Sequence, residues 1–206
     1  MLPETLAVFF VAVVLLALTP GPDNLYVLTQ SAVRGTRHGL VIVLGLCTGL
    51  LLHTLAVAVG VAALLQSSPV AMRILQWFGI AYLCLLASEA LLAAARHRPA
   101  VPRPSVAAPG GYLRGVLMNL SNPKVLLFFL AFLPQFVREE GWPTVAQILM
   151  LGGLSIAATL LVFGGIAGAA SPRAARLDPD GTWNRVMQTM TGLVLLTLAG
   201  GLLINR

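Results

Sequence analysis

Two charged residues interrupt otherwise apolar stretches of this sequence, and they are the first candidates for chemistry. Asp23 ends the segment TPGPD of residues 19–23, and Lys124 ends the segment NPK of residues 122–124. A charge inside a membrane costs on the order of 3 kcal/mol on insertion scales and usually faces the protein interior. A carboxylate and an ammonium group in such places can bind an ion or a zwitterion, or they can bind each other.

Both charges stand beside prolines, Pro20 and Pro22 in one case and Pro123 in the other. A proline has no backbone N–H and disfavours helix in the residue before it, so each segment should break a helix. Within a membrane such a break is tolerated only inside protein or beside a wet cavity. We expect the first break to extend over residues 19–23, and the helix that resumes near Asn24 to direct its free amides into an interior site.

The two charges are expected at the same depth. Eleven residues separate Asp23 from Arg34, and ten separate Lys124 from Arg114. At about 1.5 Å per residue, both side chains then lie roughly 15 to 16 Å from one face of the membrane. This depth is close to the middle of the bilayer.

Neutral polar residues around the breaks complete a candidate site. A carboxylate could bind Lys124 and helix-end amides, and an amino group could bind Asp23 and freed carbonyls, which together suit a zwitterion. The expected substrate-binding residues are Thr19, Gly21, Asp23, Asn24, Asn119, Asn122 and Lys124. Two structural alternatives stay open: Asp23 as a plain helix N-cap, and an Asp23–Lys124 ion pair without a ligand.

His53 is a further titratable residue in an apolar stretch. It could share proton coupling with Asp23, because histidine titrates near neutral pH. It could equally be a neutral packing residue that hydrogen-bonds across helices. No P-loop is present, and we expect no cofactor and no metal site.

The elements that must position these residues are transmembrane helices. The 206 residues are 58% hydrophobic and 10% charged, with a mean hydropathy of +0.89. This composition is more apolar than the core of a soluble protein of this size requires. A spanning helix needs about 20 apolar residues. The predicted all-α integral membrane fold has six spans, at about residues 5–34, 38–66, 70–95, 113–137, 143–170 and 184–205.

A proline-rich linker, residues 97–112, divides the chain into two halves, residues 1–96 and 113–206. Each half holds three predicted spans, and the first span of each half is the proline-broken one. Duplicating a unit with an odd number of spans inverts its orientation, so we expect two inverted three-helix repeats.

The net charge of +6 reports topology and not a nucleic-acid partner, because the basic residues are scattered over the connections. Nine of the twelve arginines lie in or beside the first, third and fifth connections. The positive-inside rule then places these connections in the cytosol and both termini outside it. Glycine pairs such as Gly164 and Gly168 would also allow a homodimer.

Two segments resemble the lysine exporter (LysE) superfamily, closest to its threonine and homoserine exporter branch. They are LTPGPDNLYVLTQSAVRGTRHG, residues 18–39, and GVLMNLSNPKVLLFFLAFLPQFV, residues 115–137. The resemblance covers nearly the whole chain and implies a small protein of the bacterial inner membrane that exports amino acids, in exchange for protons. It implies a transporter and not an enzyme.

The sequence therefore predicts a secondary exporter of an amino acid or a related small zwitterion, which works by alternating access around a site at mid-membrane depth. The alternative is an ion-binding or channel-like membrane protein, because broken helices also build pores.

Overall fold

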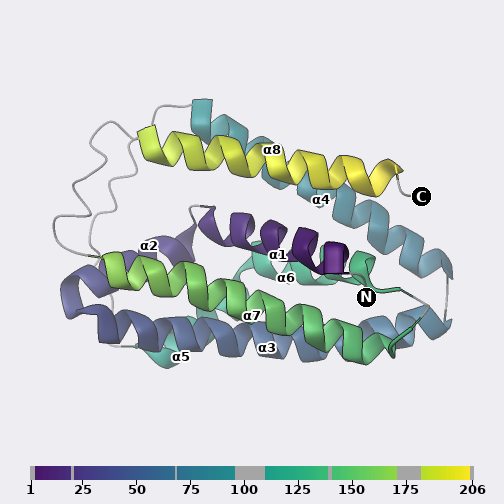
Figure 1. Cartoon of the computed structure of the whole chain (residues 1–206), viewed down its shortest axis with the longest axis horizontal. Helices are drawn as coiled ribbons and strands as arrows, with labels where there is room; N and C mark the ends of the chain where they lie inside the picture. The colour runs from purple at the N-terminus through teal and green to yellow at the C-terminus, as the bar shows by residue number, and fades with distance from the viewer. Residues whose placement is uncertain are drawn as a thin grey trace.

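The structure is a computed structural model that describes residues 3–19, 21–67, 69–95, 110–138, 141–170 and 182–204, and these form helices without strands (Figure 1). The α-helices are α1 (Pro3–Leu18), α2 (Pro22–Arg34), α3 (Thr36–Ser67), α4 (Pro69–Ala95), α5 (Tyr112–Ser121), α6 (Pro123–Leu127), α7 (Thr144–Ala169) and α8 (Thr182–Ile204). A π-helical turn, η1 (Phe128–Phe132), and a 3-10 turn, η2 (Leu133–Phe136), continue α6. The predicted all-helical class is confirmed.

Three described stretches are long and apolar enough to cross a membrane alone, Thr36–Gly60, Trp77–Ala95 and Thr144–Ala169. Two more crossings arise if each bent pair of helices forms one span. Within the described part of the chain the structure thus supports three to five spans. The predicted sixth span coincides with α8, which is not among these candidates, so six spans and an inverted repeat stay predictions.

The first break separates α1 from α2, whose axes differ by 63°. Pro20 lies outside the described residues. The helix resumes at Pro22, two residues earlier than expected, because proline is favoured at the first helical position, where an N–H would be unpaired in any case. Asp23 is therefore the second residue of α2.

The second break is a single residue, Asn122, between α5 and α6. The Asn122 Oδ1 atom accepts the backbone N–H of Lys124 at 3.0 Å and so caps α6. Pro123 again takes the first helical position. The bend between α5 and residues 123–136 is 57°.

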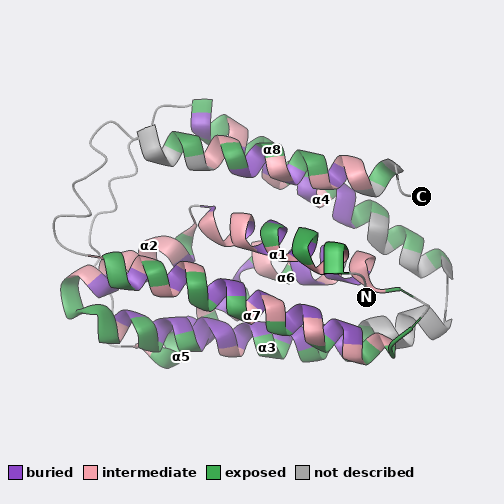
Figure 2. Ribbon diagram, viewed as in Figure 1, coloured by how far each residue is buried: buried purple, intermediate pink, exposed green. Residues whose placement is uncertain are grey.

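The helices pack so that Asp23, beside the first break, and Asn122, in the second, are buried. α3 runs along α5 and α7, α1 and α2 contact α7, and α4 pairs with α8 (Figure 1). Buried residues face inward on α3 and α7, while the outer faces are exposed (Figure 2). Many exposed side chains are large and apolar, among them Val59, Leu161 and Ile74. Extensive exposed apolar surface of this kind marks contact with a membrane.

A close approach of α3 to α5 determines where the second break lies. A Cβ atom on Gly45 would stand 3.0 Å from the Gly115 Cα atom, and one on Gly115 would stand 3.1 Å from the Gly45 Cα atom. Such contact between helix backbones requires glycine at both positions. Asn119, one turn beyond Gly115, is thereby placed against α3.

Candidate functional site

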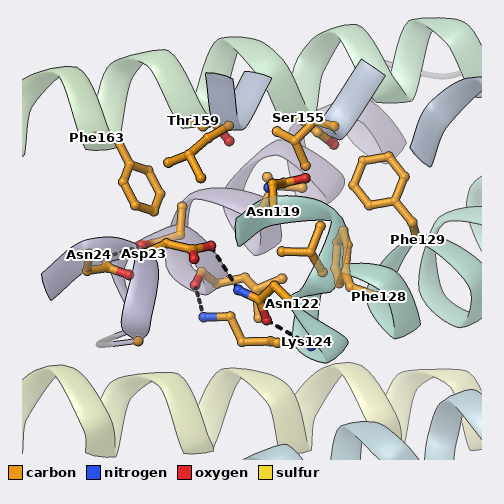
Figure 3. A pocket seen from close by; sticks show the side chains of 17 residues that line it. Asp23, Asn24, Asn119, Asn122, Lys124, Phe128, Phe129, Ser155, Thr159 and Phe163 are labelled. Atoms are coloured by element: carbon orange, nitrogen blue, oxygen red, sulfur yellow. Dashed lines mark hydrogen bonds between the residues drawn. The ribbon is translucent and has the colours of Figure 1, made fainter. Parts of the chain in front are cut away.

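A cavity of about 50 Å³ lies where the two breaks meet α3 and α7 (Figure 3). Its lining includes Gly21 and the polar residues Asp23, Asn24, Asn119, Asn122, Lys124, Ser155 and Thr159. Six of the seven residues predicted to bind substrate are among them. The structure brings these residues of both halves together, and their role as ligands of a substrate stays a prediction.

Asp23 has one occupied and one free carboxylate oxygen. Its side chain is 6% exposed, and Oδ2 accepts a hydrogen bond from Asn122 Nδ2 at 2.8 Å (Figure 3). Oδ1 is buried without a partner. The N-cap position of α2 belongs to Gly21, and no side chain caps this helix. The interpretation of Asp23 as the N-cap is therefore wrong.

Lys124 holds a backbone carbonyl of the first half. Its Nζ atom donates to the Leu16 carbonyl oxygen at 3.1 Å (Figure 3). In an uninterrupted helix this carbonyl would accept the N–H of residue 20, which proline lacks. Lys124 thus takes over part of that role, together with the Thr19 amide at 3.3 Å. No ion pair joins the described side chains of Asp23 and Lys124 in this structure.

Asn24 serves the next carbonyl of α1 in the same way. Its Nδ2 atom donates to the Ala17 carbonyl oxygen at 2.7 Å. The open end of α1 is therefore held by side chains from α2 and α6. This shows how two of the carbonyls that the break frees, those of Leu16 and Ala17, are paired at the end of a membrane helix.

Asn119 supplies a second free acceptor to the cavity. It is 3% exposed, and its Oδ1 atom is buried without a partner. Buried polar atoms are nearly always hydrogen-bonded, so two free acceptors in one cavity call for an external donor. Asp23 Oδ1 and Asn119 Oδ1 could together receive an ammonium group.

The rest of the cavity lining is apolar. It includes Leu46 and Leu50 of α3, Phe128 and Phe129 of η1, and Phe163 of α7. Ser155 and Thr159 on α7 lie across the site from Lys124 (Figure 3). The phenylalanines were not predicted, because a Phe-Phe pair in an apolar stretch carries no signal that separates a site from a core.

The remaining predicted residues lie outside the cavity. The Thr19 hydroxyl hydrogen-bonds Thr191 Oγ1 of α8 at 3.0 Å and the Leu15 carbonyl at 3.1 Å. His53 is 6% exposed, and its Nε2 atom lies 3.4 Å from the Asn119 carbonyl oxygen. Pro22 and Pro123 are exposed at the first positions of α2 and α6. Thr191 was not predicted.

Comparisons with known proteins agree with this membrane architecture. The family described as LysE type translocator matches residues 14–206. A homoserine/homoserine lactone efflux protein of Salmonella typhi is 34% identical over 161 residues, 78% of each chain. A leucine efflux protein of Salmonella typhimurium is 30% identical over 130 residues, 63% of this chain and 61% of the relative. An uncharacterized membrane protein of Vibrio cholerae is 29% identical over 165 residues, 79% of each chain. No solved structure matches significantly.

Proposed function

The chain belongs to the LysE type translocator family, a family of membrane transporters and not enzymes, and from this membership and the site we propose that it exports an amino acid or a closely related small zwitterion. Two relatives are named for efflux of homoserine, its lactone or leucine. The observation that carries the proposal is the pair of unpartnered acceptors, Asp23 Oδ1 and Asn119 Oδ1, in a cavity that also contains the Lys124 ammonium group.

In the proposed binding mode the substrate ammonium group lies between Asp23 Oδ1 and Asn119 Oδ1. The carboxylate binds Lys124 Nζ and the uncapped amides at the start of α2, where the helix dipole favours an anion. The substrate side chain then packs against the phenylalanines of η1 and α7. This arrangement uses both charges without requiring them to pair with each other.

We propose alternating access as the mechanism, and the size of the cavity supports it. About 50 Å³ is room for a few waters and not for an amino acid. Binding therefore requires the walls around the breaks to separate, and a short unwound segment in each of two helices provides hinges for such a motion. Asp23 is the proposed carrier of the exchanged proton, because a carboxylate can hold a proton or an ammonium ion in turn.

The packing pattern supports two inverted repeats and six spans. Exchanging the halves converts the contact of α3 with α5 into the contact of α7 with α1, and both contacts are observed. The same exchange maps the α3–α7 pair and the α4–α8 pair onto themselves. We place the protein in the bacterial inner membrane with both termini outside the cytosol, as the arginine distribution predicts.

A homodimer is part of the proposal. Gly164 and Gly168 on α7 have no described atom within 4 Å of a Cβ position, so this face is open to a second copy. Small residues at four-residue spacing allow helices to associate closely in lipid.

Counterflow in proteoliposomes tests the function. Vesicles loaded with unlabelled homoserine or leucine should accumulate the labelled amino acid, because an exchanger couples influx to efflux. The accumulation should exceed that of protein-free vesicles by at least about tenfold. Uptake that occurs without internal substrate, together with single-channel current, would point to a channel and contradict the proposal.

A further inference from the structure

His53 lies against a carbonyl that the second break exposes. In a continuous helix the Asn119 carbonyl oxygen would accept the N–H of residue 123, but Pro123 has none. The amide of Asn122 bends back to this oxygen at 3.1 Å and occupies one lone pair. His53 Nε2, at 3.4 Å, is the donor placed for the other.

The same residue, Asn119, contributes its side chain to the site. Its Oδ1 atom is one of the two free acceptors of the cavity. Gly49, one turn before His53 on α3, leaves room for it, since a Cβ atom there would lie 2.6 Å from Asn119 Oδ1 and from its Cβ atom. Successive turns of α3 therefore contact the side chain and the backbone of one asparagine.

The first break is held in a similar way, by a donor from the other half of the chain. Lys124 donates to the Leu16 carbonyl that Pro20 leaves without its usual partner. His53 of the first half stands in the corresponding relation to Asn119 of the second. One difference matters for function: Lys124 lines the cavity, whereas His53 lies behind Asn119 and does not line it.

We infer that His53 is a positioning residue, whose Nε2–H holds the Asn119 backbone so that Asn119 Oδ1 faces the substrate ammonium group. The inference rests on the proposed function for the identity of the ligand. It assigns His53 no contact with substrate and no part in proton transfer. A relay that used this nitrogen would have to give up the Nε2 proton, whereas a positioning residue keeps it throughout the cycle.

Two variants distinguish the hydrogen bond that His53 donates from the volume that its side chain fills. His53→Leu removes the donor and keeps an apolar side chain, while His53→Gln keeps a side-chain N–H of similar reach. Binding of labelled L-homoserine and L-leucine to the purified protein should weaken roughly tenfold in the first variant, the effect of one lost hydrogen bond, and return to within about threefold in the second. Thr54→Val, on the same turn of α3, is the control, because the Thr54 hydroxyl donates to the Leu50 carbonyl of its own helix.

A double-mutant cycle tests whether the effect of His53→Leu on binding depends on Asn119. If it does, His53→Leu should weaken binding little further once Asn119→Ala is present, because residues in one network are not additive. Full additivity would overturn the inference. So would a His53→Leu protein that is less stable but binds with unchanged affinity, and so would a His53→Gln protein that binds normally but has lost proton-coupled exchange.

A spectroscopic measurement tests, independently of transport, whether His53 Nε2 carries the proton that it is proposed to donate. The nitrogen-15 resonances of His53, assigned by comparison with His53→Gln, should show a protonated Nε2 atom in the purified protein near neutral pH. A ring protonated only on Nδ1 would overturn the inference even if export is established. An intact protein that binds neither amino acid but shows the protonated Nε2 atom, with an Asn119-dependent shift, would refute the proposed substrate and leave the contact standing.

Discussion

The two carboxylate oxygens of Asp23 have different surroundings, and this difference suggests separate roles for them. Oδ2 is held by Asn122 and fixes the side chain, while Oδ1 has no partner and is the atom available to a substrate or a proton. The sequence predicted Asp23 and Lys124, because a charge in an apolar stretch is conspicuous. It did not predict that Lys124 would bind the Leu16 carbonyl, because a backbone acceptor has no signature in the residue pattern.

Replacing Asp23 by Asn should separate export from folding. The neutral amide fills the same volume and is less costly to bury, which offsets the anion that Lys124 loses, so the protein should insert and unfold at about the same temperature. Export should fall at least about tenfold, because the ammonium group loses its charged partner. Intracellular amino acid measured in expressing cells, with thermal unfolding of the purified variant, tests both statements.

Ser121→Ala is the matched control for this substitution. Ser121 lies directly before the second break, but it is exposed and its hydroxyl bonds the carbonyls of its own helix. Export by the Ser121→Ala variant should match that of the intact protein. Equal loss in the two variants would show that any change near the breaks stops transport, and the assignment of Asp23 to the site would be withdrawn.

Lys124→Met should destabilise the protein as well as stop export. The change removes the donor to the Leu16 carbonyl and leaves Asp23 without a nearby cation, at a cost of about 1 to 3 kcal/mol for the unsatisfied buried groups. Adding Asp23→Asn should restore part of the stability, because the uncompensated charge is then gone. Thermal unfolding of the four proteins of this cycle measures the coupling.

Export by the double variant distinguishes a substrate-binding role of Asp23 and Lys124 from a purely structural one. The double variant should remain inactive, because neither end of the zwitterion has its charged partner. If the double variant regains export together with stability, the two residues only support the structure and the binding site must lie elsewhere.

At the level of elements, the breaks could be predicted and their geometry could not. Proline fixed their positions to within two residues, and the shift arose because Pro22 begins a helix as readily as it ends one. The π-helical turn at Phe128–Phe132 had no sequence signal, although such turns recur at functional sites and this one carries two cavity residues. Gly45 and Gly49 on α3 have the four-residue spacing typical of close helix contacts, but this spacing does not identify the partner helix.

Gly45→Ala tests that close contact. An added Cβ atom would collide with the Tyr112 carbonyl and press on Gly115, so α3 and α5 must separate, at a cost of about 1 to 3 kcal/mol. Gly60→Ala on the same helix meets nothing within 4 Å and should be neutral or stabilising by up to about 1 kcal/mol through helix propensity. Thermal unfolding of both variants is the measurement, and equal midpoints would contradict the observed packing.

For the whole molecule, the lengths of the apolar runs predicted the class of fold but not the arrangement of its helices. Long apolar runs indicate membrane spans, and the distribution of arginines indicates orientation. The pairing of α4 with α8, and of α3 with α7, could not be predicted, because helices that are apolar on all sides give no stripe to show which face is buried.

The orientation of the chain in the membrane tests the inverted repeat directly. In a protein without Cys47 and Cys84, a cysteine introduced as Ser105→Cys in the linker should react with a membrane-impermeant maleimide only after the cells are permeabilised. One introduced as Asn205→Cys should react in intact cells, because nine of the twelve arginines place the linker inside and both termini outside. Three spans in each half require the linker and the termini to lie on opposite sides of the membrane. Labelling of both positions from the same side would mean that the second half crosses the membrane an even number of times, and two inverted three-helix repeats would then be excluded.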